Sequence, residues 1–98
     1  MFKKLQGIIK QDGEDVWSDF YRVLEAEGCI DAEYVQHTLG QDISNVIEDV
    51  DRMSLETVYT WLTWILRGER FCDGLFDACL ADGTLSKLLK RGELLCQR

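Results

Sequence analysis

The fold is decided by the stretch from Ser54 to Leu66, which reads SLETVYTWLTWIL. Its apolar side chains recur at the spacing of one face of an α-helix, and Trp61 and Trp64 widen that face. Serine is a favoured N-cap residue, so we expect Ser54 to begin the helix. A helix that is apolar around most of its circumference normally lies in the middle of a core. We therefore expect this helix to be the central element of the fold.

Helical spacing of apolar residues also marks the segments on both sides of this helix. The further expected helices cover residues 2–10, 14–27, 31–38, 43–50, 75–80 and 84–95. The segments 31–38 and 43–50 are brief and weak. Gly28 and Gly40 are placed to end two of these helices, while Asp31 and Thr84 are placed to cap two others. The sequence predicts an all-α fold, a small single-domain bundle of about five to six short helices over residues 1–98.

Two glycine positions interrupt the helical pattern. The run Gln11-Asp12-Gly13 is expected to break the chain between the first expected helix and the second, which would start at Glu14. Gly92 lies within the last expected helix, where glycine costs about 1 kcal/mol relative to alanine. We therefore expect that helix to be weak in its last turn.

The four cysteines, at positions 29, 72, 79 and 96, do not have the spacing of a zinc site. No C-x-x-C pair occurs, and the single histidine, His37, has no cysteine at zinc-finger spacing. Cys72 and Cys79 are expected on one face of the same helix. Because buried reduced cysteines behave as small hydrophobes, we predict free thiols, no metal site and no cofactor.

Apolar runs in this chain are short. None approaches the ~20 residues that a membrane-spanning helix needs. The basic start, Met1-Phe2-Lys3-Lys4-Leu5, is not followed by the apolar region of a secretory signal peptide. We therefore expect a cytoplasmic protein that does not bind membranes.

Charge is distributed unevenly along the chain, which has a net charge of −7. Residues 11–57 carry thirteen acids against two arginines, whereas residues 1–10 carry three lysines and residues 58–98 are close to neutral. An acidic surface repels phosphate backbones and attracts basic partners. The expected partner is a protein with a basic surface, and direct binding of nucleic acid is not expected.

The most specific segment is Arg67-Gly68-Glu69-Arg70-Phe71-Cys72-Asp73-Gly74. An Asp-Gly turn at residues 82–83 and a leucine helix rich in lysine and arginine follow it. This arrangement resembles the C-terminal signature of a family of uncharacterised bacterial and phage proteins, whose members carry a similar R-x-E-R-F-C-D-G segment. Gly68 replaces a usual alanine, and Gly92 falls where the family's final helix continues. The resemblance implies a helical fold and a frequent occurrence in mobile elements, and it implies no reaction.

Two interpretations of this segment stay open. In a packing role, Asp73 would cap the helix that starts near Gly74, Phe71 and Cys72 would fill the core, and Glu69 would pair with a neighbouring arginine. In a binding role, the segment would contact a partner. The candidate binding residues are Arg67, Glu69, Arg70 and Asp73.

Patterns typical of enzyme sites do not occur in the sequence. Acid–base and nucleophilic catalysis need titratable groups held together in a cleft. The acids fall on helix positions expected to face solvent, and His37 has no evident partner. No phosphate-binding glycine loop, dinucleotide fingerprint or H-E-x-x-H motif is present. We therefore predict no catalytic residues and no enzymatic activity.

Two functional hypotheses remain. In the first, the chain is an acidic inhibitor or regulator, encoded by a phage or mobile element, that binds a basic nucleic-acid-handling protein as DNA mimics and inhibitors of CRISPR nucleases do. Its partner-binding residues would be Asp42, Glu48, Asp49 and Asp51. In the second, the chain is a small homodimeric interaction module. Its interface would be an aromatic stripe made of Trp17, Phe20, Tyr21, Trp61 and Trp64.

Overall fold

The computed structural model describes residues 1–11 and 15–96, and their regular secondary structure is entirely helical. The elements are α1 (Phe2–Ile9), α2 (Val16–Ala26), α3 (Tyr34–His37), α4 (Ile43–Val46), the 3₁₀ helix η1 (Ile47–Arg52), α5 (Leu55–Gly68), α6 (Leu75–Ala81) and α7 (Thr84–Cys96). The all-α prediction is confirmed. The expected number of five to six helices is too low, because each weak segment between residues 31 and 52 forms helical turns of its own and there are seven α-helices.

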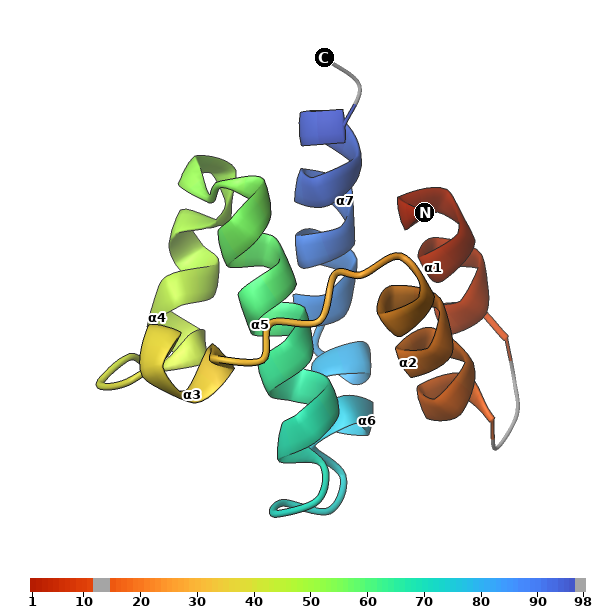
Figure 1. The fold of residues 1–98 in the computed structure, drawn as a ribbon, viewed down its shortest axis with the longest axis horizontal. Coiled ribbons are helices and arrows are strands. Elements are labelled where there is room, and N and C mark those ends of the chain that lie inside the picture. The colour runs from red at the N-terminus through yellow and green to blue at the C-terminus, as the bar shows by residue number, and fades with distance from the viewer. Residues whose placement is uncertain (12–14, 97–98) are drawn as a thin grey trace.

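Helix α5 lies at the centre of the fold, as the sequence predicts. Val58, Leu62 and Ile65 on this helix are fully buried, and α5 packs against α3, α6 and α7. Ser54 is its N-cap, with the hydroxyl oxygen accepting a hydrogen bond of 3.2 Å from the backbone N–H of Thr57. Figure 1 shows α5 and α7 side by side in the middle of the molecule.

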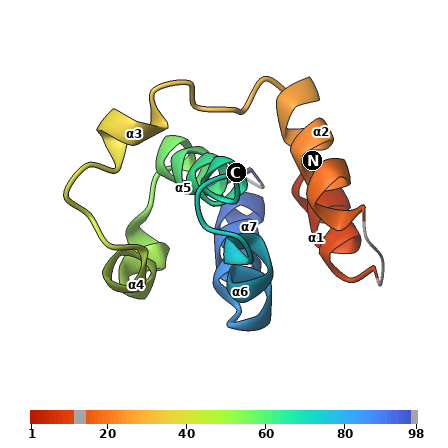
Figure 2. The ribbon, with the colours of Figure 1, turned by 90° about the horizontal axis from the view of Figure 1, so that it is seen from below.

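Helices α1 and α2 pack together on one side of this centre, and α1 also contacts α7 (Figures 1 and 2). The predicted break after α1 and the predicted helix start at Glu14 fall on residues 12–14, outside the described residues. Gly28 follows the end of α2, as predicted, with a positive φ of 72°. Cys29 N–H donates to the Leu24 carbonyl and Gly28 N–H to the Glu25 carbonyl, both at 3.0 Å. These two bonds satisfy the last carbonyls of α2.

The segment that contains α3, α4 and η1 forms the opposite side of the molecule (Figure 2). The predicted helix at 43–50 divides into α4 and η1. Inside η1 the chain is kinked at Asp49, whose φ and ψ of −102° and 24° are not helical. Buried Met53 follows η1, and its carbonyl accepts a 3.0 Å hydrogen bond from Nε of Arg91 on α7. This bond attaches the end of η1 to the central pair of helices.

Each of the four cysteines lies in the described part of the chain and is a free thiol. Cys79 is buried, and burial raises its pKa to about 11. Cys72 lies in the turn before α6, so the expectation that it shares a helix face with Cys79 is wrong. Residues 1–11 and 15–96 contain no cluster of three or more metal-ligating side chains. No helix within these ranges has the length and apolar character to cross a membrane.

Candidate functional site

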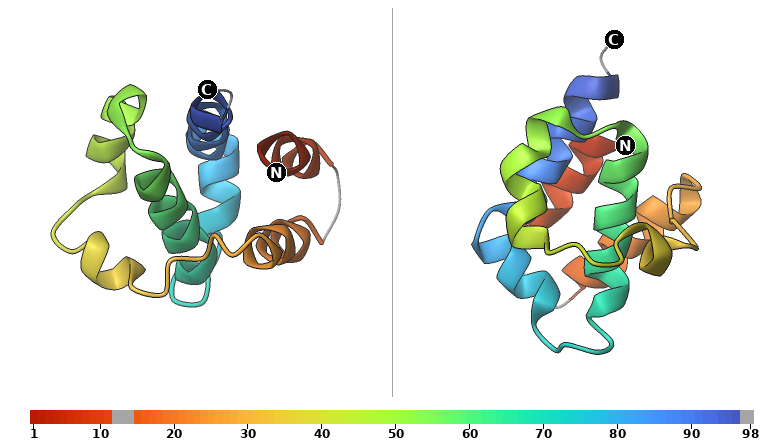
Figure 3. Two further views of the ribbon diagram at one scale, coloured as in Figure 1. Left: turned by 45° about the horizontal axis from the view of Figure 1, so that its top comes forward. Right: turned by 90° about the vertical axis from the view of Figure 1, so that its left-hand side faces the viewer.

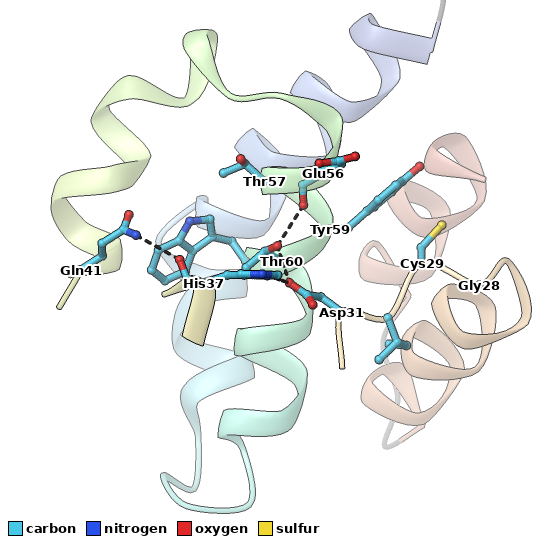
Figure 4. Close-up of a pocket in the computed structure, with 11 residues that line it drawn as sticks. Gly28, Cys29, Asp31, His37, Gln41, Glu56, Thr57, Tyr59 and Thr60 are labelled. Atoms are coloured by element: carbon cyan, nitrogen blue, oxygen red, sulfur yellow. Dashed lines mark hydrogen bonds and ion pairs between the residues drawn. The ribbon is translucent and has the colours of Figure 1, made fainter. Parts of the chain in front are cut away.

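An open pocket of ≈ 450 Å³ lies where the chain passes from α2 to α3 over the side of α5. Its lining includes Asp31, His37, Gln41, Glu56, Tyr59 and Thr60. Figure 4 shows the Asp31 carboxylate, the His37 ring and the Thr60 hydroxyl meeting in the middle of this lining. The pocket therefore combines acidic, hydroxyl and aromatic groups from two parts of the chain that lie far apart in sequence.

Asp31 ties this part of the chain to α5. Its carboxylate accepts hydrogen bonds from Thr60 Oγ1 at 2.7 Å and from the backbone N–H of Glu33 at 2.9 Å. Its own N–H donates to Thr63 Oγ1 at 3.0 Å. Partial burial acts to raise the pKa of Asp31, but the bonds from Thr60, His37 and Glu33 outweigh it and hold the pKa below its ordinary value.

The N-cap role expected for Asp31 is wrong. Glu33 occupies the N-cap position of α3, and its side chain makes no capping bond. The carboxylate of Asp31 still accepts from the N–H of Glu33 with Oδ1, while its Oδ2 accepts from Thr60 on α5. A tertiary contact with a hydroxyl on another helix is thus added to the local bond, and the helix begins later than the sequence suggested.

His37 has a partner, contrary to the sequence expectation. Its Nδ1 lies 2.6 Å from Oδ2 of Asp31, and its Nε2 lies 3.8 Å from Glu33. The hydrogen bond to Asp31 and the negative charges of Asp31, Glu33 and Glu56 raise the pKa of His37 above its ordinary value. The only hint in the sequence is an aspartate six residues before the histidine, and that spacing is typical of no motif.

In the Asp31–His37 pair, a carboxylate holds Nδ1 of the imidazole, as it does for a histidine that acts as a base. Nucleophilic catalysis needs a nucleophile within hydrogen-bond reach of the base. In the described residues, the Thr60 hydroxyl at this site contacts the carboxylate and not the imidazole. Burial raises the pKa of Tyr59, so its hydroxyl stays protonated. The expected lack of enzymatic activity stays a prediction.

The acidic residues predicted to bind a partner lie along one continuous segment on the outer side of the molecule (Figure 1). We call this segment the acidic flank, and it comprises the exposed residues Asp42, Glu48, Asp49 and Asp51. Asp42 is also the N-cap of α4, with its carboxylate accepting from Ser44 N–H at 2.9 Å. Within residues 1–11 and 15–96, no lysine or arginine forms an ion pair with the flank, although Arg52 follows Asp51 in η1.

In the segment 67–74, Glu69 has a structural role that the sequence assigned to another residue. Its carboxylate accepts from the N–H groups of Gly74 at 2.8 Å and Phe76 at 2.7 Å, and so caps the start of α6. The capping role expected for Asp73 is therefore wrong, and Asp73 is exposed. The pairing expected between Glu69 and a neighbouring arginine is replaced by these two backbone bonds.

The expectation that Phe71 and Cys72 fill the core is also wrong. Phe71 is 86% exposed and Cys72 is exposed, whereas Phe76 is buried against Phe20 with ring centroids 5.7 Å apart. The physical reason is the turn between α5 and α6, which ends at Gly74 in a left-handed conformation with φ of 89°. This turn extends beyond the end of α5 (Figure 1), and α6 then returns Phe76 to the core.

The four residues of the alternative binding site do not converge. Arg67 turns toward α2 and α3, where its Nε donates to the Tyr21 hydroxyl at 3.2 Å and its guanidinium lies 5.9 Å from the centre of the Tyr34 ring. Glu69 turns toward α6, while Arg70 and Asp73 are exposed in the turn. The segment therefore serves mainly to join α5 to its neighbours.

The aromatic stripe suggested as a dimer interface is largely used inside the chain. Phe20 and Trp61 are buried, and Trp61 packs edge-to-face on half-buried Trp64 with centroids 5.4 Å apart. Trp17 Nε1 donates to the Leu66 carbonyl at 3.1 Å. The stripe is thus not a free surface, while dimerisation itself stays a prediction.

Comparison with known proteins adds one finding to this geometry. No curated protein and no solved structure matches the chain. The model of a family of unknown function matches nearly its whole length, from residue 8 to residue 98. The chain therefore belongs to that family, the family of unknown function DUF6508.

Proposed function

We propose that this chain is a non-enzymatic regulator that binds a protein, and that its acidic flank contacts a basic surface on that partner. The observation that carries the proposal is the set of four exposed carboxylates at residues 42–51, which form no ion pair with a lysine or arginine in the described part of the chain. Charges left unpaired on a surface are available to a partner of opposite sign. The proposed setting is the cytoplasm.

The class of partner follows from how the carboxylates of the flank are arranged. Asp42 at the start of α4 and Glu48, Asp49 and Asp51 on η1 line one segment with negative charges, as phosphates line a nucleic-acid strand. A protein that handles nucleic acid presents a basic channel to such a row. We therefore propose a nucleic-acid enzyme as the partner and inhibition by DNA mimicry as the mode of action. A chain carried by a phage or another mobile element and directed against a CRISPR nuclease is the concrete form of this proposal.

The test reverses the charge of the flank. The triple variant E48K/D49K/D51K should lose inhibition of a CRISPR nuclease in a DNA-cleavage assay at low salt, while its circular dichroism spectrum stays native. The matched control is D15K/E25K/D77K, which changes the net charge equally at exposed positions outside both candidate sites and should still inhibit. Inhibition should also weaken steeply as salt is raised, because screening shortens the reach of surface charges.

Two results would count against the proposal. One is full inhibition by the flank triple variant. The other is a failure of the wild-type chain to inhibit any of a panel of nucleases with basic channels at low salt. Equal loss of inhibition in the flank and control variants would show that net charge, and not the flank, carries the effect.

A further inference from the structure

Helix α3 lies on the same side of the molecule as α4 and η1, which carry the acidic flank (Figure 3). Two large apolar side chains, on α3 and in the turn after it, are exposed. Val35 is 59% exposed and Leu39 is 77% exposed. Helix α3 ends at His37, and the chain then turns, with Thr38 N–H donating to the Tyr34 carbonyl at 3.0 Å and Leu39 N–H donating to the Gln36 carbonyl at 3.4 Å. Val35 therefore lies on α3 and Leu39 in the turn that directly follows it. We call Val35 and Leu39 together the α3 face.

The part of the chain that contains this face is acidic. Between residues 27 and 51 the chain carries seven acids and no lysine or arginine. Glu33 is exposed on the turn before α3, and the neighbouring pocket of ≈ 450 Å³ adds Asp31 and Glu56. An apolar centre with a rim of one charge sign is complementary to an apolar partner surface whose rim carries the opposite sign.

We propose that the α3 face and the adjoining pocket together bind a basic amphipathic helix of the partner protein. Apolar side chains of that helix cover Val35 and Leu39, and an arginine or lysine beside them enters the pocket toward Glu56 and Asp31. The proposal deepens the proposed function and rests on it for the basic character of the partner. It adds an apolar anchor, which gives affinity that charge alone does not.

His37 gives this mode of binding a distinctive pH dependence. The imidazole feels the negative charges of Asp31, Glu33 and Glu56, and its Nδ1 lies 2.6 Å from Oδ2 of Asp31. A protonated ring competes with an incoming cation for these carboxylates. Deprotonation leaves the Asp31 carboxylate without that charge partner. Binding of an arginine-bearing helix should therefore strengthen as pH rises through the pKa of His37, because arginine stays charged throughout this range.

The experiment uses a fluorescein-labelled synthetic helix with leucine on one face and arginine on the other, and measures its binding to the full chain by fluorescence anisotropy. V35S/L39S should weaken binding by about tenfold or more, the cost of losing a buried apolar anchor. The matched control is F71S/L94S, which removes two apolar side chains that are 86% and 52% exposed on other parts of the surface. That variant should bind like the wild type.

Two further measurements test the apolar contact and the role of His37 separately. A peptide of the same composition, scrambled so that it has no apolar face, should bind more weakly than the amphipathic one. Raising the pH from 6 to 8.5 should tighten binding to the wild type, and this gain should vanish in H37Q. Equal binding of the two peptides, an equal loss in the control variant, or no pH effect would overturn the proposal.

Failure of this inference is distinguishable from failure of the proposed function. If V35S/L39S weakens peptide binding while E48K/D49K/D51K inhibits a nuclease fully, the α3 face binds the peptide as proposed and the flank is not needed for inhibition. If the flank variant loses inhibition while V35S/L39S binds the peptide normally, the reverse holds. A wild-type dimer in sedimentation that V35S/L39S dissolves would identify a second copy as the occupant and overturn the proposal.

Discussion

Gly92 is the position where the structure reverses a sequence-based expectation about stability. Alanine is favoured over glycine inside a helix by about 1 kcal/mol, so the sequence suggests that G92A stabilises α7. In the fold, a Cβ atom at position 92 would lie 2.3 Å from both Cε1 and Cζ of Phe2. Ordinary contacts between carbon atoms are about 3.5–4.0 Å. The missing side chain of Gly92 is what lets α1 approach α7.

The magnitude follows from how firmly Phe2 is held. Its side chain is only 4% exposed, and its ring stacks on Tyr59 at 6.0 Å with an interplanar angle of 2°. Overpacking of this kind costs about 1–3 kcal/mol, which exceeds the helix-propensity gain of about 1 kcal/mol. We expect G92A to destabilise the domain by up to about 2 kcal/mol, and F2L/G92A to recover part of that loss by removing ring atoms from the clash.

Urea denaturation followed by circular dichroism is the assay, and the chain offers a matched control. Gly7 lies in α1 and is exposed, and a Cβ atom at this position would have no other atom within 4 Å outside its own helix turn. G7A should therefore raise stability by about 1 kcal/mol, which corresponds to about 4–8 °C in the melting temperature of a domain of this size. If G92A stabilises as much as G7A does, the packing of Phe2 on Gly92 is refuted.

Three further predictions follow from the contacts of the site and the core. E69A should destabilise the domain by about 1–2 kcal/mol because it removes the cap of α6, whereas D73A should change the urea midpoint little; the opposite order would restore the capping role first expected for Asp73. In an NMR titration, His37 should show a pKa above 6.5 that falls in D31N, and an unchanged value would show that the pair does not form. The stabilisation from this raised pKa is fully present below the unfolded value of 6.5 and is lost as pH rises through the folded pKa, so the melting-temperature difference between wild type and H37Q should shrink toward alkaline pH. L62A should cost about 2–5 kcal/mol, and a small midpoint shift would mean that α5 is not central.

The sequence by itself determined the class of fold and its central helix. The spacing of apolar residues between Ser54 and Leu66, the N-cap at Ser54 and the left-handed glycine at Gly28 all take the roles predicted for them. These features depend on neighbouring residues in the chain, because caps and helical periodicity are local properties. They can therefore be predicted without knowledge of the tertiary fold.

Only the tertiary structure decided which side chains meet. Asp31 bonds Thr60 across 29 residues of sequence as well as the N–H of Glu33, and the same carboxylate contacts His37. Gly92 and Phe2 come from opposite ends of the chain, so the helical pattern of the sequence does not predict that they pack together. In the segment 67–74, the sequence suggested Asp73 as the cap of α6, and the path of the turn brings the carboxylate of Glu69 to the first N–H groups of that helix. In each case a contact between separate elements outweighed the local preference, because several elements must pack before these groups come within bonding distance.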